Sequence, residues 1–209
     1  MSLHTFAPEE EHITELRRQL QRFVAQKMPR ALRRECDQNH TWPREIFKEL
    51  ADMGLIGLTV EEKHGGSGQD LVAAVAVIEE LAQVGPFLAG PYIHAAFYGG
   101  MNLSENGSEA QKEALLPKIV NGELLLSYGL SEPNVGGDLA SVETRAEKKA
   151  GKIIVNGTKR WCTGADWSDY IYCLVRSGEA DARYKNLSML LIPTDTPGIS
   201  MQPIEHANL

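Results

Sequence analysis

The sequence predicts an α+β protein of two domains, with helices in residues 1–124 and strands in residues 125–209. Up to about Gly122, apolar residues recur every three or four positions, which is the period of an amphipathic helix. Beyond it, short apolar runs are bounded by turn residues, which is typical of strands. A block of helices followed by a block of strands indicates segregated domains rather than an alternating βαβ sheet.

Local signals bound the expected helices at residues 8–27, 43–54, 71–84, 90–103 and 108–120. The first carries one apolar stripe, formed by Ile13, Leu16, Leu20, Phe23 and Val24. Residues 71–84 are apolar over most of the helix circumference, so we expect this helix to be buried. Ser108 with Gln111 three residues later is a capping-box pattern that opens the last helix.

The expected strands cover residues 124–130, 153–163, 170–176 and 187–193. Asn156-Gly157 offers a hairpin turn between two strand-like runs. Because alternate residues of a strand share a face, Trp161 and Thr163 are expected to point the same way.

Composition excludes several classes of protein. The formal net charge of −7 argues against nucleic-acid binding, because the local run at Arg30, Arg33 and Arg34 is interrupted by acids and fits a solvated helix face. No apolar stretch reaches the roughly 18 residues of a membrane span, and no signal-peptide pattern opens the chain. Three scattered cysteines without a CxxC pair fit a reducing compartment, so a cytoplasmic location is expected.

Common catalytic signatures are absent from the sequence. It contains no Walker loop, no GxSxG nucleophile elbow and no GxGxxG fingerprint. The six histidines show no metal-binding spacing, so no metal site is expected. The loop from Glu61 to Gly68 admits a metal or phosphate-loop interpretation, but a solvated, flexible connection between helices is favoured.

Two segments carry candidate chemistry. The first, residues 128–138, leaves a strand, turns at Pro133-Asn134 and opens two glycines, whose bare N–H groups suit an anion. The second, residues 159–164, places a tryptophan beside a threonine, a plausible wall for a planar ring. Taken singly, the first segment is also compatible with a plain turn, and the tryptophan with a core residue.

Together, these two segments resemble the acyl-CoA dehydrogenase family. The resemblance is carried by Ser-Glu-Pro-x-x-Gly-x-Asp at residues 131–138 and Asn-Gly-Thr-Lys-x-Trp-x-Thr at residues 156–163. Residues 60–66 are similar to that family's Pro-Glu-Glu-x-Gly-Gly loop, with Val60 in place of proline, and residues 107–122 to its last N-terminal helix. The resemblance extends over residues 6–209.

The resemblance implies a helical N-terminal domain followed by an antiparallel, barrel-like FAD-binding domain, here incomplete. It implies desaturation of an acyl-CoA thioester between Cα and Cβ, with hydride transfer to N5 of FAD and reoxidation by an electron-transfer flavoprotein. The FAD contacts that it implies are Tyr128, Gly129, Leu130, Ser131, Glu132, Pro133, Asn134, Val135, Gly136, Gly137, Trp161, Cys162 and Thr163.

Within this set, Ser131 and Thr163 would hydrogen-bond the edge of the isoalloxazine ring, and Trp161 would cover the ring. Gly136 and Gly137 would lie near the pyrophosphate. Many relatives have a serine where Gly137 stands, so its substrate contact is in doubt. The helix around residues 94–101 is expected to border the acyl tail.

Length is the largest departure from the family. Relatives continue into a C-terminal helical bundle that holds the glutamate base and much of the subunit interface, and no acid of this chain occupies the position of that base. We therefore expect no catalytic residue in these 209 residues and no turnover by them alone. Full-length relatives form tetramers or dimers. Alternatives are a non-catalytic partner subunit that binds FAD or acyl-CoA, and an oxygen-using oxidase or monooxygenase on the same fold.

Overall fold

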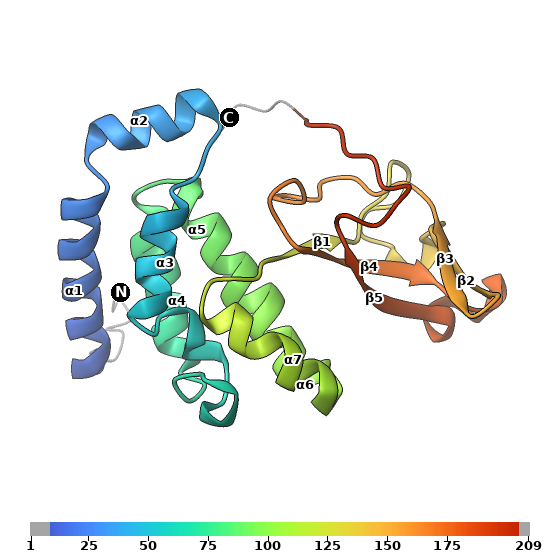
Figure 1. The fold of residues 1–209 in the computed structure, drawn as a ribbon, viewed down its shortest axis with the longest axis horizontal. Helices are drawn as coiled ribbons and strands as arrows, with labels where there is room; N and C mark the ends of the chain where they lie inside the picture. The colour runs from blue at the N-terminus through green and yellow to red at the C-terminus, as the bar shows by residue number, and fades with distance from the viewer. Residues whose placement is uncertain (1–8, 205–209) are drawn as a thin grey trace, which may run out of the picture. The chain divides into compact units, whose positions relative to one another are not determined.

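The computed structural model describes residues 9–204, which fall into two compact units, residues 9–123 and Leu124–Ile204 (Figure 1). The first unit is helical and the second is built on a sheet, which confirms the predicted fold class. Within the described residues, no helix combines the length and the apolar character needed to cross a membrane.

The first unit is a helical assembly. Its α-helices are α1 (Glu11–Lys27), α2 (Arg30–Asn39), α3 (Arg44–Asp52), α4 (Leu71–Ala82), α5 (Pro86–Tyr92), α6 (Asn102–Asn106) and α7 (Glu109–Val120). Two short 3₁₀ turns, η1 (Ile56–Thr59) and η2 (Glu62–His64), connect α3 to α4. Between α5 and α6 lies η3 (Ile93–Met101), a π-helix, so the chain stays helical from Pro86 to Asn106.

Local sequence signals account for several of these bounds. The stripe expected on α1 is the face that packs inward, since Ile13, Leu20 and Val24 are buried. The capping box at the start of α7 is formed: the Gln111 amide N–H donates to Ser108 Oγ, and the Ser108 amide N–H donates to Gln111 Oε1. Because these two amides at the start of the helix gain partners, the helix begins where the sequence predicts.

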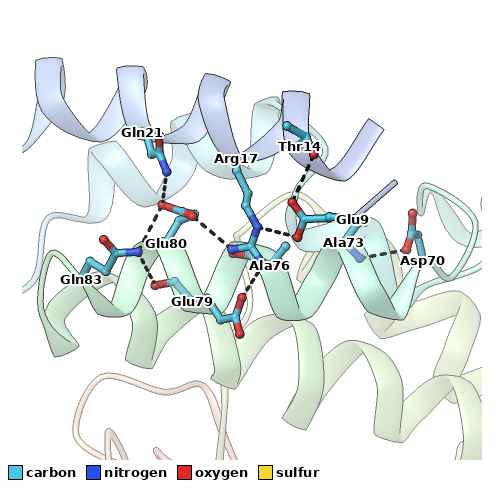
Figure 2. Close-up of polar contacts among 10 residues, drawn as sticks. All are labelled: Glu9, Thr14, Arg17, Gln21, Asp70, Ala73, Ala76, Glu79, Glu80 and Gln83. Atoms are coloured by element: carbon cyan, nitrogen blue, oxygen red, sulfur yellow. Dashed lines mark hydrogen bonds and ion pairs between the residues drawn. The ribbon is translucent and has the colours of Figure 1, made fainter. Parts of the chain in front are cut away.

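Helix α1 docks on α4 through an apolar patch and a polar network. Ile13 packs against Ala73 and Ala76 of α4. Beside this patch, the Arg17 guanidinium pairs with Glu79 and with Glu80, whose side chain is only 6% exposed (Figure 2). Other donors to that buried carboxylate are the side-chain amides of Gln21 and Gln83. Each of these donors helps to satisfy a charge that burial alone would disfavour.

The expectation that residues 71–84 form a fully buried helix is wrong. In α4, Leu71, Val72 and Val75 are 51%, 66% and 44% exposed. Helix α2 has only one buried residue, Cys36, so no apolar period marks its bounds in the sequence. Helix α4 therefore buries one side and leaves apolar residues exposed on the other.

The second unit is an open, mixed sheet. Its strands are β1 (Leu126–Gly129), β2 (Arg145–Lys149), β3 (Lys152–Asn156), β4 (Tyr170–Arg176) and β5 (Leu187–Pro193). They are ordered β1-β4-β2-β3, with β5 pairing to β4. The β1–β4 and β2–β4 pairs are parallel, whereas β2–β3 and β4–β5 are antiparallel. The sheet is therefore not purely antiparallel, and it is not closed among the described residues.

Two details of the predicted strands differ from the structure. The hairpin that joins β2 to β3 turns at Ala150-Gly151, whose φ angles of 50° and 76° fit a primed turn, and not at Asn156-Gly157. Strand β2 was not expected, because its sequence Arg-Ala-Glu-Lys-Lys has no apolar alternation. Strand β3 ends at Asn156, so residues 157–163 are not a strand.

Candidate functional site

The two segments singled out in the sequence lie side by side in the second unit. The amide N–H of Arg160 donates to the carbonyl of Ser131 at 2.8 Å. Lys159 Nζ donates to the carbonyl of Leu130 at 3.0 Å, and Ser127 Oγ donates to the carbonyl of Thr163 at 2.9 Å. Residues 159–163 therefore run along β1 and the loop that follows it.

The buried side chain of Glu132 connects these two segments through hydrogen bonds. Its buried carboxylate accepts hydrogen bonds from Lys159 Nζ at 2.9 Å, from the Glu143 amide at 2.6 Å and from the Thr144 amide at 2.9 Å. The hydroxyl of Thr144 is a fourth donor, at 2.5 Å. The Glu132 side chain is thus fully engaged by protein groups, and it supports the loop without pointing to its exposed side.

Charge and hydrogen bonding keep this carboxylate ionised. Burial opposes ionisation and raises the pKa of Glu132, but the hydrogen bonds from Lys159, Thr144 and the Glu143 backbone outweigh it. The net result lowers the pKa of Glu132 to about 2. Since the Lys159 and Glu132 side chains are only 10% and 4% exposed, solvent screens their attraction little.

The loop after β1 folds back on itself at the predicted turn. The amide N–H of Glu132 donates to the carbonyl of Val135 at 2.8 Å, and the reverse bond is 3.2 Å, so Pro133 and Asn134 form the exposed corner. Val135 is buried with Val142 and Leu174 in the small core beneath the loop, and the half-buried Leu130 packs against them. The side chains of Leu130 and Val135 therefore hold the loop in place from its inner side.

Glycines shape the backbone on both sides of this turn. A Cβ on Gly129 would lie 2.9 Å from Ile171 Cγ2 and 3.5 Å from Lys159 Cγ, so glycine allows the lysine to pass close to β1. At Gly136 and Gly137 a Cβ would meet nothing within 4 Å. These two exposed residues leave their backbone open to a ligand that approaches from solvent.

Trp161 stands out from the surface in a strained conformation. Its φ angle is 62°, which is unusual for a bulky residue, and its side chain is 59% exposed. The guanidinium carbon of Arg160 lies 4.4 Å from the ring centroid. The strand argument for Trp161 and Thr163 is wrong because this stretch is irregular, although both residues are exposed. The alternative that Trp161 is a core residue is also wrong.

Three further residues of the predicted FAD-contact set, Cys162, Tyr128 and Ser131, are half-buried. Cys162 is half-buried, and burial raises the pKa of its thiol, so it is a poor nucleophile. The ring of Tyr128 is half-buried beside Tyr172, with ring centroids 5.6 Å apart. Ser131 is likewise half-buried, at the point where the two segments join.

Sequence reasoning missed the partners that hold the site together. Lys159 was part of the quoted motif but had no role, and Thr144 lies just before an unexpected strand. The available signal was that Lys159 lies in the same short motif as Trp161 and Thr163. A third feature is visible only in the structure: a Cβ on Gly157 would come within 2.6 Å of Thr144 Cα, so glycine is needed where the chain passes Thr144.

Comparison with known proteins identifies the family. The acyl-CoA dehydrogenase N-terminal domain matches residues 9–123, and the acyl-CoA dehydrogenase middle domain matches residues 127–208. The chain therefore belongs to the acyl-CoA dehydrogenase family, whose members are FAD-dependent flavoproteins and oxidoreductases of acyl-CoA metabolism.

Individual relatives agree in sequence and fold. The chain is 32% identical over 165 residues to the probable acyl-CoA dehydrogenase YngJ of Bacillus subtilis, an overlap of 79% of this chain and 43% of that protein. The acyl-CoA dehydrogenase structure from Geobacillus kaustophilus matches 93% of this chain and 51% of its own, with 30% identity and a TM-score of 0.84.

A further solved structure, the ChsE4-ChsE5 complex from Mycobacterium tuberculosis, matches 97% of this chain and 52% of its own. The identity is 27% and the TM-score is 0.78. The chain thus spans about half the length, or less, of the proteins that it matches.

The exposed side of the site fits the cofactor of this family. A flat ring needs a planar, accessible neighbour, which Trp161 provides, and a pyrophosphate needs bare amides, which Gly136 and Gly137 leave open. Among the described residues, no three His, Cys, Asp or Glu side chains gather as a metal site would require.

Proposed function

We propose that this chain is the flavin-binding portion of an acyl-CoA dehydrogenase. In this proposal Trp161 covers the isoalloxazine ring, Ser131 and Thr163 hydrogen-bond its edge, and Gly136 and Gly137 approach the pyrophosphate. The rest of the contact set predicted from residues 128–137, together with Cys162, lines or supports this surface. Glu132, Leu130 and Val135 contribute by holding the backbone.

When bound, FAD would supply the redox chemistry, accepting a hydride from Cβ of an acyl-CoA thioester. The residues of this chain would do three things around it. The strained turn at Trp161 would present the indole to the ring, the Thr163 and Ser131 hydroxyls would fix the ring's orientation, and the small core under Leu130 would keep the support rigid. An electron-transfer flavoprotein is the proposed acceptor of the electrons.

One observation carries this proposal. The buried pair of Lys159 and Glu132 joins two distant segments, and Trp161, Thr163 and the open glycines of these segments are all exposed. A strained tryptophan that is 59% exposed costs stability and recovers little of it through packing. Such strain is characteristic of ligand sites.

Titration of the purified protein with FAD, followed by flavin fluorescence, tests the proposal. We expect Gly136→Ala and Gly137→Ala to weaken binding by about tenfold, or about 1.4 kcal/mol, because a methyl group would stand between amide and phosphate. Gly90→Ala is the matched control, since a Cβ there also meets nothing within 4 Å. Equal affinity for FAD in all three variants would contradict the proposed site.

A second candidate is a subunit that binds FAD or acyl-CoA beside a catalytic partner. It is favoured by Gly137, which has no side chain to offer a substrate, and by the likeness to a solved complex of two named chains. Because these 209 residues are expected to lack the base, anaerobic addition of acyl-CoAs to the FAD-loaded product of the complete gene separates the two candidates. Bleaching of the flavin supports a dehydrogenase, whereas acyl-CoA binding without bleaching supports the partner subunit.

A further inference from the structure

The loop from Glu61 to Gly68, expected to be a solvated connection, is mostly exposed, but one of its side chains, His64, turns inward. His64 is only 8% exposed, so the solvated interpretation is wrong for this residue. The loop is held by backbone bonds, in which the Gly65 and Gly66 amides donate to the carbonyls of Glu62 and Glu61 at 2.9 and 3.1 Å. An ordered loop gives the buried histidine a fixed position.

Two buried polar atoms near this loop have no hydrogen-bond partner among the described residues. They are His64 Nε2, at the end of η2, and Ser104 Oγ, in α6. Both residues line the same small cavity, together with Glu61, Lys63 and Lys112. A buried polar group that lacks a partner is costly, and two that face one space can share a partner there.

The charges around the cavity determine which kind of ligand it can hold. Lys63 Nζ lies 2.8 Å from a Glu61 carboxylate oxygen, and Lys112 Nζ lies 3.0 Å from Glu109. Each ammonium group is therefore already neutralised by a carboxylate. A bound anion would meet the Glu61 carboxylate as well as the lysines, so the cavity favours a neutral ligand.

The size of the cavity and its hydrogen-bonding groups restrict the possible ligands further. The cavity has a volume of about 10 Å³, which is the lower end of what one water molecule needs. Water can donate to one partner and accept from the other, whichever tautomer His64 adopts.

We propose that this cavity is a binding site for one water molecule, which bridges His64 Nε2 and Ser104 Oγ. The bridge ties the Glu61–Gly68 loop to α6. The bridge does not depend on flavin binding by the second unit. A test of the bridge is therefore independent of a test of the proposed function.

Magnetic relaxation dispersion of water ¹⁷O in a solution of the purified protein counts long-lived internal waters. We expect Ser104→Val, which fills the cavity and removes one partner, to lower the count by one. Ser141→Ala, which removes an exposed hydroxyl in the second unit, should leave the count unchanged. An unchanged count in a folded Ser104→Val protein would overturn the proposal.

A crystal structure of the unmodified protein provides the second measurement. One density peak within about 2.6–3.2 Å of both atoms supports the bridge. An empty cavity, or an anomalous peak after a bromide soak that identifies an anion, would refute it. This measurement also covers the case in which the valine variant does not fold.

Discussion

Lys159 and Glu132 form an ion pair with an Nζ–Oε1 distance of 2.9 Å, buried beneath the exposed face that carries Trp161. The two residues are 27 positions apart, and each belongs to one of the two motifs that mark the family. The pair therefore joins the two motifs in this chain: one supplies the carboxylate and the other supplies its cation.

Replacing Lys159 by methionine should lower the free energy of unfolding by about 3–5 kcal/mol, because Glu132 would remain buried without its cation. Urea denaturation measures the change. Arg183→Ala is the matched control, since its pair with Asp138 is 3.4 Å long and exposed, and should cost less than about 1 kcal/mol. Equal losses in both variants would show that the buried pair has no special role.

Acid should remove the contribution of Glu132 to stability. Its folded-state pKa of about 2 lies below the ordinary value of 4.5, so the contribution is complete above pH 4.5 and is lost as the pH falls towards 2. At neutral pH it amounts to about 3 kcal/mol. We expect the difference in unfolding free energy between the protein and Glu132→Gln to shrink steadily across this range. A difference that is constant with pH would contradict the low pKa.

Trp161→Ala should weaken FAD binding by about 1–3 kcal/mol while leaving the stability of the free protein nearly unchanged. The reason is that the ring is 59% exposed and has little packing to lose. Tyr184→Ala is a close control, because Tyr184 is 63% exposed and also lies beside an arginine, Arg183. If both variants bind FAD as the unmodified protein does, Trp161 is not part of the flavin site.

Gly157→Ala should disrupt the site through its backbone. The added methyl group would come within 2.6 Å of Thr144 Cα, and Thr144 also donates two hydrogen bonds to Glu132. We expect a loss of about 2 kcal/mol or more in unfolding free energy, together with weaker FAD binding. Gly151 makes a useful comparison, since a Cβ there meets nothing, although its φ of 76° adds a local strain. Only the Gly157 variant should affect FAD affinity.

Arg17→Met should loosen α1 from α4. The buried Glu80 would lose its cation and keep only the amide donors of Gln21 and Gln83 (Figure 2). Hydrogen exchange should then rise across Glu11–Lys27. Arg22→Met serves as the control, because its pair with Glu15 is exposed. Protection of α1 that is equal in both variants would show that apolar packing around Ile13 is sufficient.

Much of the fold could be predicted because local chemistry and tertiary packing agree there. The bounds of β4 and β5 match the expected runs at 170–176 and 187–193 residue for residue, since both are apolar runs between turn residues. Helix α7 could be placed for a similar reason, because its capping box is a purely local signal.

The failures occur where partners far along the chain decide the structure. Strand β2 consists mostly of charged residues and exists because β3 pairs with it through a turn at Ala150-Gly151. Residues 157–163 look strand-like by composition, but their backbone is bonded to Ser131 and Ser127 instead of to a neighbouring strand.

For the candidate site, too, one part could be predicted from the sequence and another part could not. The sequence predicted which two segments meet, but it could not separate residues that support the surface from residues that form it. Glu132 and Val135 belong to the support, and Trp161 belongs to the surface, although the resemblance implies all three alike as FAD contacts.

The π-helix at Ile93–Met101 can accommodate the loss of one residue more easily than an α-helix can. Each turn there holds more residues than an α-turn does, so one residue could be removed if the segment rewound as an ordinary α-helix. Side chains on the N-terminal side would then rotate by about 100° relative to those of α6. Deletion of a single residue would thus turn different side chains of this stretch toward their neighbours, while α5 and α6 remained intact.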